Sequence, residues 1–176
     1  MDTILIYIAE LKKLGEKEFE LLHPEPVLLI DRSSANLNPE KQFFTREMPV
    51  LSELEKQKTT GAYTISRHPN EYLLVKIAKK NHGLWQDRIS LGRAKNNDIT
   101  INNQSISKLH AHFTSNKKGE IFITDIKSSN GIKLNKKRIL PNKPTQLNPG
   151  DSLRFGEVKA SFQQGKSLIK WLQKWL

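Results

Sequence analysis

Three short polar blocks in the middle of the chain contain side chains suited to binding an anion. They are Gly92-Arg93, the run Ser107-Lys108-Leu109-His110-Ala111, and the run Ser128-Ser129-Asn130-Gly131. The guanidinium of Arg93 is planar and permanently charged, which suits phosphate better than an ammonium does. Serine hydroxyls and an asparagine amide can add short hydrogen-bond donors to such a site. The pattern therefore indicates anion binding on loops that a rigid scaffold must hold together.

In this order, the blocks resemble the forkhead-associated (FHA) family of β-sandwich modules, which bind phosphothreonine peptides. The resemblance is extended by Asn97-Asp98-Ile99 and by the run from Leu147 to Leu153, with Gly156 and Phe162 behind it. It covers roughly residues 72–163. The resemblance implies a mainly β fold, an FHA-like β-sandwich of two antiparallel sheets.

The resemblance implies that five residues bind the phosphopeptide. Arg93 matches the arginine that contacts phosphate, and Ser107 matches a serine whose hydroxyl donates to a phosphate oxygen. Lys108 stands where arginine is commoner, so it keeps a charge but loses the two-pronged geometry. Ser129 lies where a hydroxyl often adds a phosphate contact. Asn130 matches the asparagine whose amide holds the peptide backbone just beyond the phosphothreonine.

Four other residues are implied to support the site without touching ligand. His110 matches a histidine that holds the loops by hydrogen bonds, and Asn97 lies in a segment that shapes the first loop. Gly92 and Gly131 complete their blocks. The sequence departs from the family pattern at Ile132, where threonine is usual, and at Lys136, where glycine is usual. Despite these departures, the resemblance implies support roles for Gly92, Asn97, His110 and Gly131.

No catalytic, metal or cofactor site is predicted. His110 and His112 would face the same way in a strand and could share a metal, but no third ligand follows at a suitable spacing. Cysteine is absent, which excludes thiol chemistry and disulfides. The sequence also contains no phosphate-cradling P-loop, H-E-x-x-H or G-x-S-x-G motif and no kinase signature. We therefore predict a protein that is not an enzyme.

The chain divides into three predicted regions. An N-terminal extension and linker, residues 1–71, contains a helix over 1–22, a short strand at Val27–Ile30 and loops. The FHA-like domain, residues 72–163, follows, and residues 164–176 form an amphipathic C-terminal helix. That helix could lie on a membrane surface or in a partner's groove, or dock on its own protein. The clearest strand predictions are 72–78, 88–91, 99–101, 111–114, 120–124, 132–134 and 152–155.

The net charge of +11 points to anionic partners. The motifs favour a phosphothreonine-containing protein, such as a Ser/Thr kinase or its substrate, and a non-catalytic role in kinase signalling. A basic nucleic-acid or anionic-membrane binder is the first alternative, and an FHA-like scaffold that binds protein without phosphate is the second. We expect a soluble, cytoplasmic protein, because no apolar run approaches the length of a membrane span.

A threonine pair in the predicted linker suggests self-regulation. Thr59-Thr60 lies just upstream of the predicted sandwich. If either threonine were phosphorylated, the linker could fold back into the chain's own site, since tethering gives it a high effective concentration.

Overall fold

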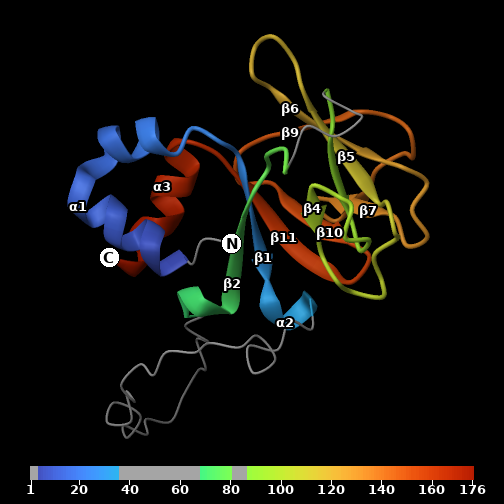
Figure 1. Cartoon of the computed structure of the whole chain (residues 1–176), viewed down its shortest axis with the longest axis horizontal. Helices are drawn as coiled ribbons and strands as arrows, with labels where there is room; N and C mark the ends of the chain where they lie inside the picture. The colour runs from blue at the N-terminus through green and yellow to red at the C-terminus, as the bar shows by residue number, and fades with distance from the viewer. Residues whose placement is uncertain (1–3, 36–67, 81–86) are drawn as a thin grey trace, which may run out of the picture.

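The computed structural model describes residues 4–35, 68–80 and 87–176, and within them two β-sheets pack face to face with helices beside one sheet (Figure 1). The first sheet contains β1 (Val27–Asp31), β2 (Tyr72–Lys76), β7 (Ile132–Leu134), β8 (Lys137–Arg138), β10 (Ser152–Phe155) and β11 (Val158–Gln163). The second contains β3 (Ile89–Gly92), β4 (Ile99–Thr100), β5 (Ala111–Ser115), β6 (Ile121–Asp125) and β9 (Thr145–Leu147). The predicted mainly β sandwich of two sheets is confirmed.

The strand orders are β2-β1-β11-β10-β7-β8 in the first sheet and β4-β3-β5-β6-β9 in the second. All pairs are antiparallel except β3 with β4, which run parallel. The second sheet is therefore mixed, whereas we expected two antiparallel sheets. The parallel pair arises because the Arg93–Asp98 loop returns the chain beside β3, where Ile99 pairs with Leu91.

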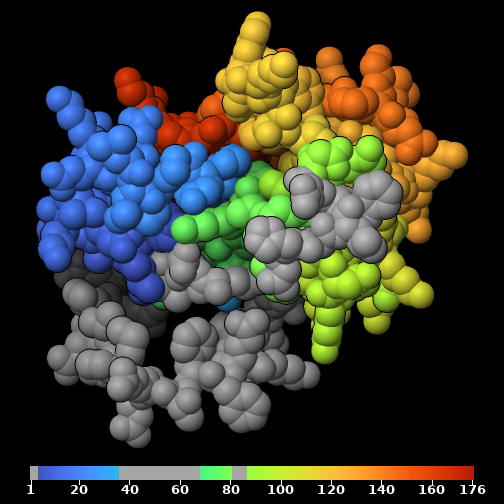
Figure 2. Space-filling view, turned by 45° about the horizontal axis from the view of Figure 1, so that its top comes forward, coloured from blue at the N-terminus to red at the C-terminus, as the bar shows by residue number. Residues whose placement is uncertain are grey.

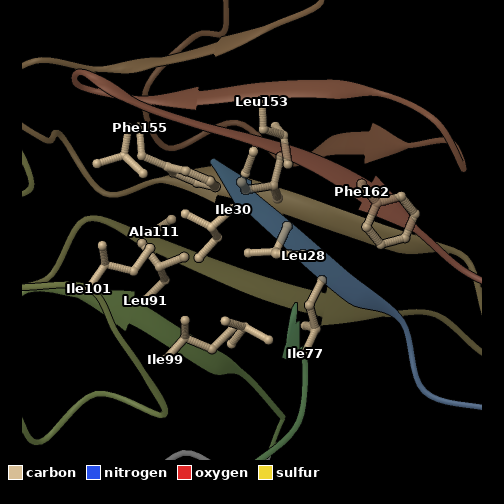
Figure 3. Close-up of a cluster of buried hydrophobic side chains, with 14 of the residues drawn as sticks. Leu28, Ile30, Ile77, Leu91, Ile99, Ile101, Ala111, Leu153, Phe155 and Phe162 are labelled. Carbon is tan, nitrogen blue, oxygen red and sulfur yellow. The ribbon is translucent and has the colours of Figure 1, made fainter. Parts of the chain in front are cut away.

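Alternating burial along the strands builds the core between the sheets. In β10, Leu153 and Phe155 are buried while Ser152 and Arg154 are exposed, because successive strand side chains point to opposite faces. Leu28 and Ile30 of β1 point between the sheets toward residues of β3 and β5 (Figure 3). This core lies under the loops that carry the predicted site.

The N-terminal strand is a central part of the first sheet. Leu28 pairs with Val75 of β2 on one side and with Phe162 of β11 on the other. This strand belongs to the stretch that the sequence assigned to an N-terminal extension. It is fully buried, as expected for a strand covered on both faces. The boundaries at 71/72 and 163/164 remain predictions.

The helices form a second apolar cluster on the outer face of β1 and β2. They are α1 (Ile4–Leu22) and α3 (Lys166–Leu172), and the 3-10 turn η3 (Gln173–Trp175) follows α3. Leu168 and Leu172 pack with Tyr7, Val27 and Leu29. The apolar face of the C-terminal helix is therefore docked on its own protein. In Figure 2, the α1 and α3 residues gather at one side of the molecule, beside the strands.

Helix α1 is broken in its middle by Gly15, whose φ of 77° is left-handed. A left-handed φ strongly favours glycine, because glycine has no Cβ. Within the described residues, no helix is both long and apolar enough to cross a lipid bilayer.

Several local predictions were wrong or lie outside the described residues. Residues 32–35 form a short helix, α2 (Arg32–Ala35), in a stretch that the sequence assigned to a polar loop. Asp31 caps it by accepting the Ser33 N–H at 3.0 Å. A further 3-10 turn, η2 (Pro69–Glu71), ends the predicted linker. The predicted Thr59-Thr60 switch lies outside the described residues.

The docking of the C-terminal segment can be tested with two leucines of that segment. Leu172 is fully buried, whereas Leu176 is 58% exposed. We expect Leu172→Ala to lower the free energy of unfolding by about 2–5 kcal/mol, because it leaves a cavity between α3 and the sheet. Leu176→Ala should change it by less than about 0.5 kcal/mol. Chemical denaturation measures both, and equal effects would contradict the docked arrangement.

Candidate functional site

The loops at one end of the sandwich bring the predicted site residues together. Arg93 directly follows β3, Ser107 and Lys108 lie between β4 and β5, and Ser129 and Asn130 lie between β6 and β7. This end is opposite the β5–β6 turn, which projects at the top of Figure 1. All five residues predicted to bind the phosphopeptide therefore lie on adjacent loops.

Backbone hydrogen bonds join the Arg93 loop to the Ser107 loop. The N–H of Arg93 donates to the Ser107 carbonyl at 3.0 Å, and the N–H of Ala94 donates to the Lys108 carbonyl at 3.2 Å. The Asn97 amide nitrogen donates to the same Lys108 carbonyl at 2.7 Å. We call these three hydrogen bonds the loop clamp. The clamp places the Arg93 backbone beside Ser107, and the Arg93 side chain is exposed.

Gly92 makes the loop clamp possible. A Cβ atom at this position would lie 2.2 Å from the Lys108 carbonyl oxygen and 2.8 Å from the Asn97 amide nitrogen. No side chain fits such a distance without moving the backbone. The support roles predicted for Gly92 and Asn97 thus have a direct steric and hydrogen-bonding basis.

The Ser107 hydroxyl connects a third loop to the other two. Its oxygen accepts the Ser129 N–H at 3.0 Å, and the two serine hydroxyl oxygens are 3.4 Å apart. Ser107 is half-buried and Ser129 is exposed, so both hydroxyls border solvent. The arrangement brings two hydroxyls together among the loops that also carry Arg93 and Lys108.

Asn130 is held by a contact to the β4–β5 loop. Its amide nitrogen donates to the Ser105 carbonyl at 2.8 Å, and its side-chain oxygen has no hydrogen-bond partner among the described residues. Because Asn130 is exposed, that oxygen can accept a hydrogen bond from a ligand. Gly131 follows with φ of 73° and donates its N–H to the Ser128 hydroxyl at 3.0 Å.

His110 supports the Ser107 loop from inside the sandwich. The ring is fully buried, and its Nδ1 accepts the Ser107 N–H at 3.1 Å. An accepting Nδ1 assigns the proton to Nε2, which is the neutral form. Burial lowers the pKa of His110, while the nearby charge of Asp125 and the Gly131 backbone oppose that shift. The histidine therefore stays neutral and holds the loop from below.

The sequence did not single out the polar residues that support these loops from behind. Asp125 is fully buried at the end of β6 and accepts the Ser128 N–H at 2.8 Å. The Ser105 hydroxyl accepts the Glu157 N–H at 3.0 Å, which ties the β4–β5 loop to the β10–β11 turn. An Asp three residues before Ser128 is a local turn signal. The Ser105 contact joins residues far apart in sequence, so no local signal exists for it.

The site contains charge and donors suited to a phosphorylated ligand. Arg93 and Lys108 are exposed, and no carboxylate among the described residues forms an ion pair with either one. Within the part of the chain that the structure describes, no group of His, Cys, Asp and Glu could hold a metal ion. The arrangement can bind a dianion through one guanidinium, one ammonium and neighbouring hydroxyls.

The buried histidine predicts a pH dependence of stability. Because the folded pKa of His110 lies below its ordinary value of 6.5, the unfolded chain takes up a proton first as the pH falls. The contribution is fully present above about pH 6.5 and is lost as the pH falls through the folded pKa. We expect the free energy of unfolding to fall from pH 7.5 to pH 5, and less steeply in His110→Gln.

His112 serves as the comparison for this experiment. Burial, followed by the charge of Arg88, lowers its pKa as well, so His112→Gln should also flatten the profile in part. Denaturation curves across the pH range measure all three proteins. A His110→Gln profile as steep as that of the wild type would show that His110 is not a neutral buried support.

Comparisons with known proteins place this site in a family. The profile of the FHA domain matches residues 89–156. The chain is 30% identical over 117 residues to an Arabidopsis thaliana "Protein phosphatase 1 regulatory inhibitor subunit PPP1R8 homolog", covering 58% of this chain and 32% of the relative. It is 38% identical over 78 residues to the Danio rerio "E3 ubiquitin-protein ligase rnf8", covering 42% of this chain and 16% of the relative.

Among solved structures, the chain is similar to Mycobacterium tuberculosis EmbR in complex with a low-affinity phosphopeptide. The identity is 29%, the TM-score is 0.41, and the match covers 45% of this chain and 20% of that one. The chain thus spans a third or less of the length of each of these proteins. The family match includes the Arg93, Ser107 and Asn130 blocks, and residues 89–156 belong to the FHA domain family.

Proposed function

We propose that this chain is a non-catalytic, phosphothreonine-dependent protein-interaction module that acts in Ser/Thr kinase signalling. The observation that carries the proposal is the loop clamp. It places the Arg93 backbone beside Ser107 through a 3.0 Å hydrogen bond, so neighbouring loops carry a guanidinium and a hydroxyl. The FHA family match over residues 89–156 supports the same proposal.

The ligand that fits this site carries a compact group with about two negative charges. A phosphothreonine side chain carries about −1.5 to −2 charges at neutral pH and offers three strong acceptor oxygens. Arg93 and Lys108 supply the opposite charge, and the Ser107 and Ser129 hydroxyls supply short donors. Charge-assisted hydrogen bonds of this kind are roughly twice as strong as neutral ones, so an unphosphorylated threonine would bind far more weakly.

Asn130 gives the site a contact to the peptide backbone. Its amide nitrogen is fixed on the Ser105 carbonyl at 2.8 Å, so its oxygen is held in a defined direction. An amide oxygen in that position can accept a backbone N–H of an extended peptide. The partner is thus a protein segment that contains phosphothreonine, such as a Ser/Thr kinase or one of its substrates.

Replacement of Arg93 tests the proposed phosphate contact. Losing a hydrogen bond to a charged group costs about 1.5–3 kcal/mol, so Arg93→Ala should weaken binding of a phosphothreonine peptide more than tenfold. Lys95→Ala is the matched control, because Lys95 is an exposed cation on the same loop. Calorimetry with phosphorylated and unphosphorylated forms of one peptide measures the effect. Equal affinity of the wild type for both forms would refute the proposal.

Replacement of Ser107 separates its two roles. The hydroxyl accepts the Ser129 N–H, so Ser107→Ala should lower the free energy of unfolding by about 0.5–1.5 kcal/mol. If the hydroxyl also donates to phosphate, the affinity for a phosphothreonine peptide should fall severalfold at a temperature where both proteins are fully folded. A stability loss with unchanged affinity would assign this hydroxyl to loop support alone.

A further inference from the structure

The outer face of the first sheet carries a row of positive charge across three neighbouring strands. Arg154 of β10 lies directly opposite Lys133 of β7 and directly opposite Lys159 of β11. All three side chains are exposed, while their neighbours Leu153 and Ala160 point into the core. We call Lys133, Arg154 and Lys159 the cationic row. The row lies on the half of the sheet away from α1 and α3, which pack over β1 and β2.

The cationic row is electrostatically unfavourable on its own. Like charges directly opposite each other on a sheet repel and destabilise the pair. Within the described part of the chain, no carboxylate forms an ion pair with any member of the row. Arg154 donates from Nε to the Gly156 carbonyl at 2.9 Å, which fixes its position but does not neutralise its charge.

The surface around the row is hollowed. A groove with a volume of about 430 Å³ is lined by the cationic row, by Lys136 and Ser152, and by Leu153 and Ala160. Its described lining contains four cationic side chains and no carboxylate. Concave surfaces lined by one sign of charge raise the local concentration of the opposite charge. The groove is therefore suited to a ligand with several closely spaced negative charges.

The row lies next to the proposed phosphopeptide site. Lys133 follows Asn130 by three residues, a span of roughly 10 Å when extended. The β10–β11 turn joins the two places, because the Gly156 N–H donates to the Gly131 carbonyl at 3.2 Å and the Gly156 carbonyl accepts from Arg154. A peptide whose backbone passes Asn130 can continue onto the cationic row.

We propose that the cationic row binds an acidic segment of the same partner that presents the phosphothreonine, a proposal that rests on the proposed function. An extended peptide places alternate side chains about 6.8 Å apart on one face, so two or three carboxylates can meet the row. Nucleic acid fits less well, because the described lining of the groove has no aromatic side chain on which bases could stack.

The test compares two phosphothreonine peptides that differ only in a tail placed beyond a spacer of about three residues. One tail is a run of glutamates and the other a run of glutamines. At about 0.15 M salt, the acidic tail should raise the affinity of the wild type about three- to tenfold. Lys133→Gln/Lys159→Gln should abolish that gain while the glutamine-tailed peptide binds as before.

The matched control is Lys117→Gln/Lys118→Gln, which removes two exposed lysines from the β5–β6 turn at the far end of the sandwich (Figure 1). This control should keep the gain in affinity from the acidic tail.

The possible outcomes separate this proposal from the proposed function. If neither peptide binds, the proposed function fails. If both bind equally to the wild type, or if the control also loses the gain, the cationic row is not the acidic-segment site. A further test adds a short single-stranded DNA that supplies the same concentration of negative charges as the acidic-tailed peptide. If the DNA displaces the acidic tail, the row binds nucleic acid and the proposal is overturned.

Discussion

The binding end of this protein depends on the close approach of two backbone segments, Gly92-Arg93 and Ser107-Lys108. The approach is so tight that a Cβ at position 92 would lie 2.2 Å from the Lys108 carbonyl oxygen. The Asn97 amide completes the contact by donating to the carbonyls of Ala94 and Lys108, each at 2.7 Å. These contacts fix the backbone of Arg93 relative to the backbone of Ser107. Preorganisation of this kind reduces the entropic cost of binding.

His110 connects the packed core of the sandwich to these loops. The histidine is fully buried and contacts Phe155 of the opposite sheet edge to face, with ring centroids 6.0 Å apart. Its Nδ1 holds the Ser107 backbone, and burial keeps the ring neutral by lowering its pKa. A single buried side chain thus connects the first sheet, the second sheet and the β4–β5 loop. The loops can be exposed and polar because their support is buried.

Local sequence patterns predicted the parts of the fold in which each strand alternates buried and exposed residues. β7 and β10 have the predicted bounds, β5 extends one residue past its predicted end, and β6 begins and ends one residue later than predicted. The short edge strands β8 and β9 were missed, because Lys137-Arg138 has no apolar residue and Thr145–Leu147 has one. Strand β1 was predicted, but its place between β2 and β11 depends on contacts far away in sequence.

Sequence motifs likewise identified some residues of the site and missed others. The motif blocks identified Arg93, Ser107 and Asn130, and the structure places all three on adjoining loops at one end. Asp125 and Ser105 were missed because they lie outside those blocks themselves, although Asp125 accepts a hydrogen bond from Ser128 within one. The cationic row was missed for a similar reason, since Lys133, Arg154 and Lys159 come from three strands. Only the register of β7, β10 and β11 brings their charges together.

The measurement that tests the central claim most directly is an NMR titration of the isotope-labelled chain with a phosphothreonine peptide. We predict that the resonances of Arg93, Ser107, Ser129 and Asn130 shift together and saturate. The unphosphorylated peptide should leave those resonances unchanged at the same concentration. Backbone amides of the β5–β6 turn should stay in place with either peptide. Shifts elsewhere on the sandwich with these loops unaffected, or identical shifts with both peptides, would contradict phosphothreonine binding by these loops.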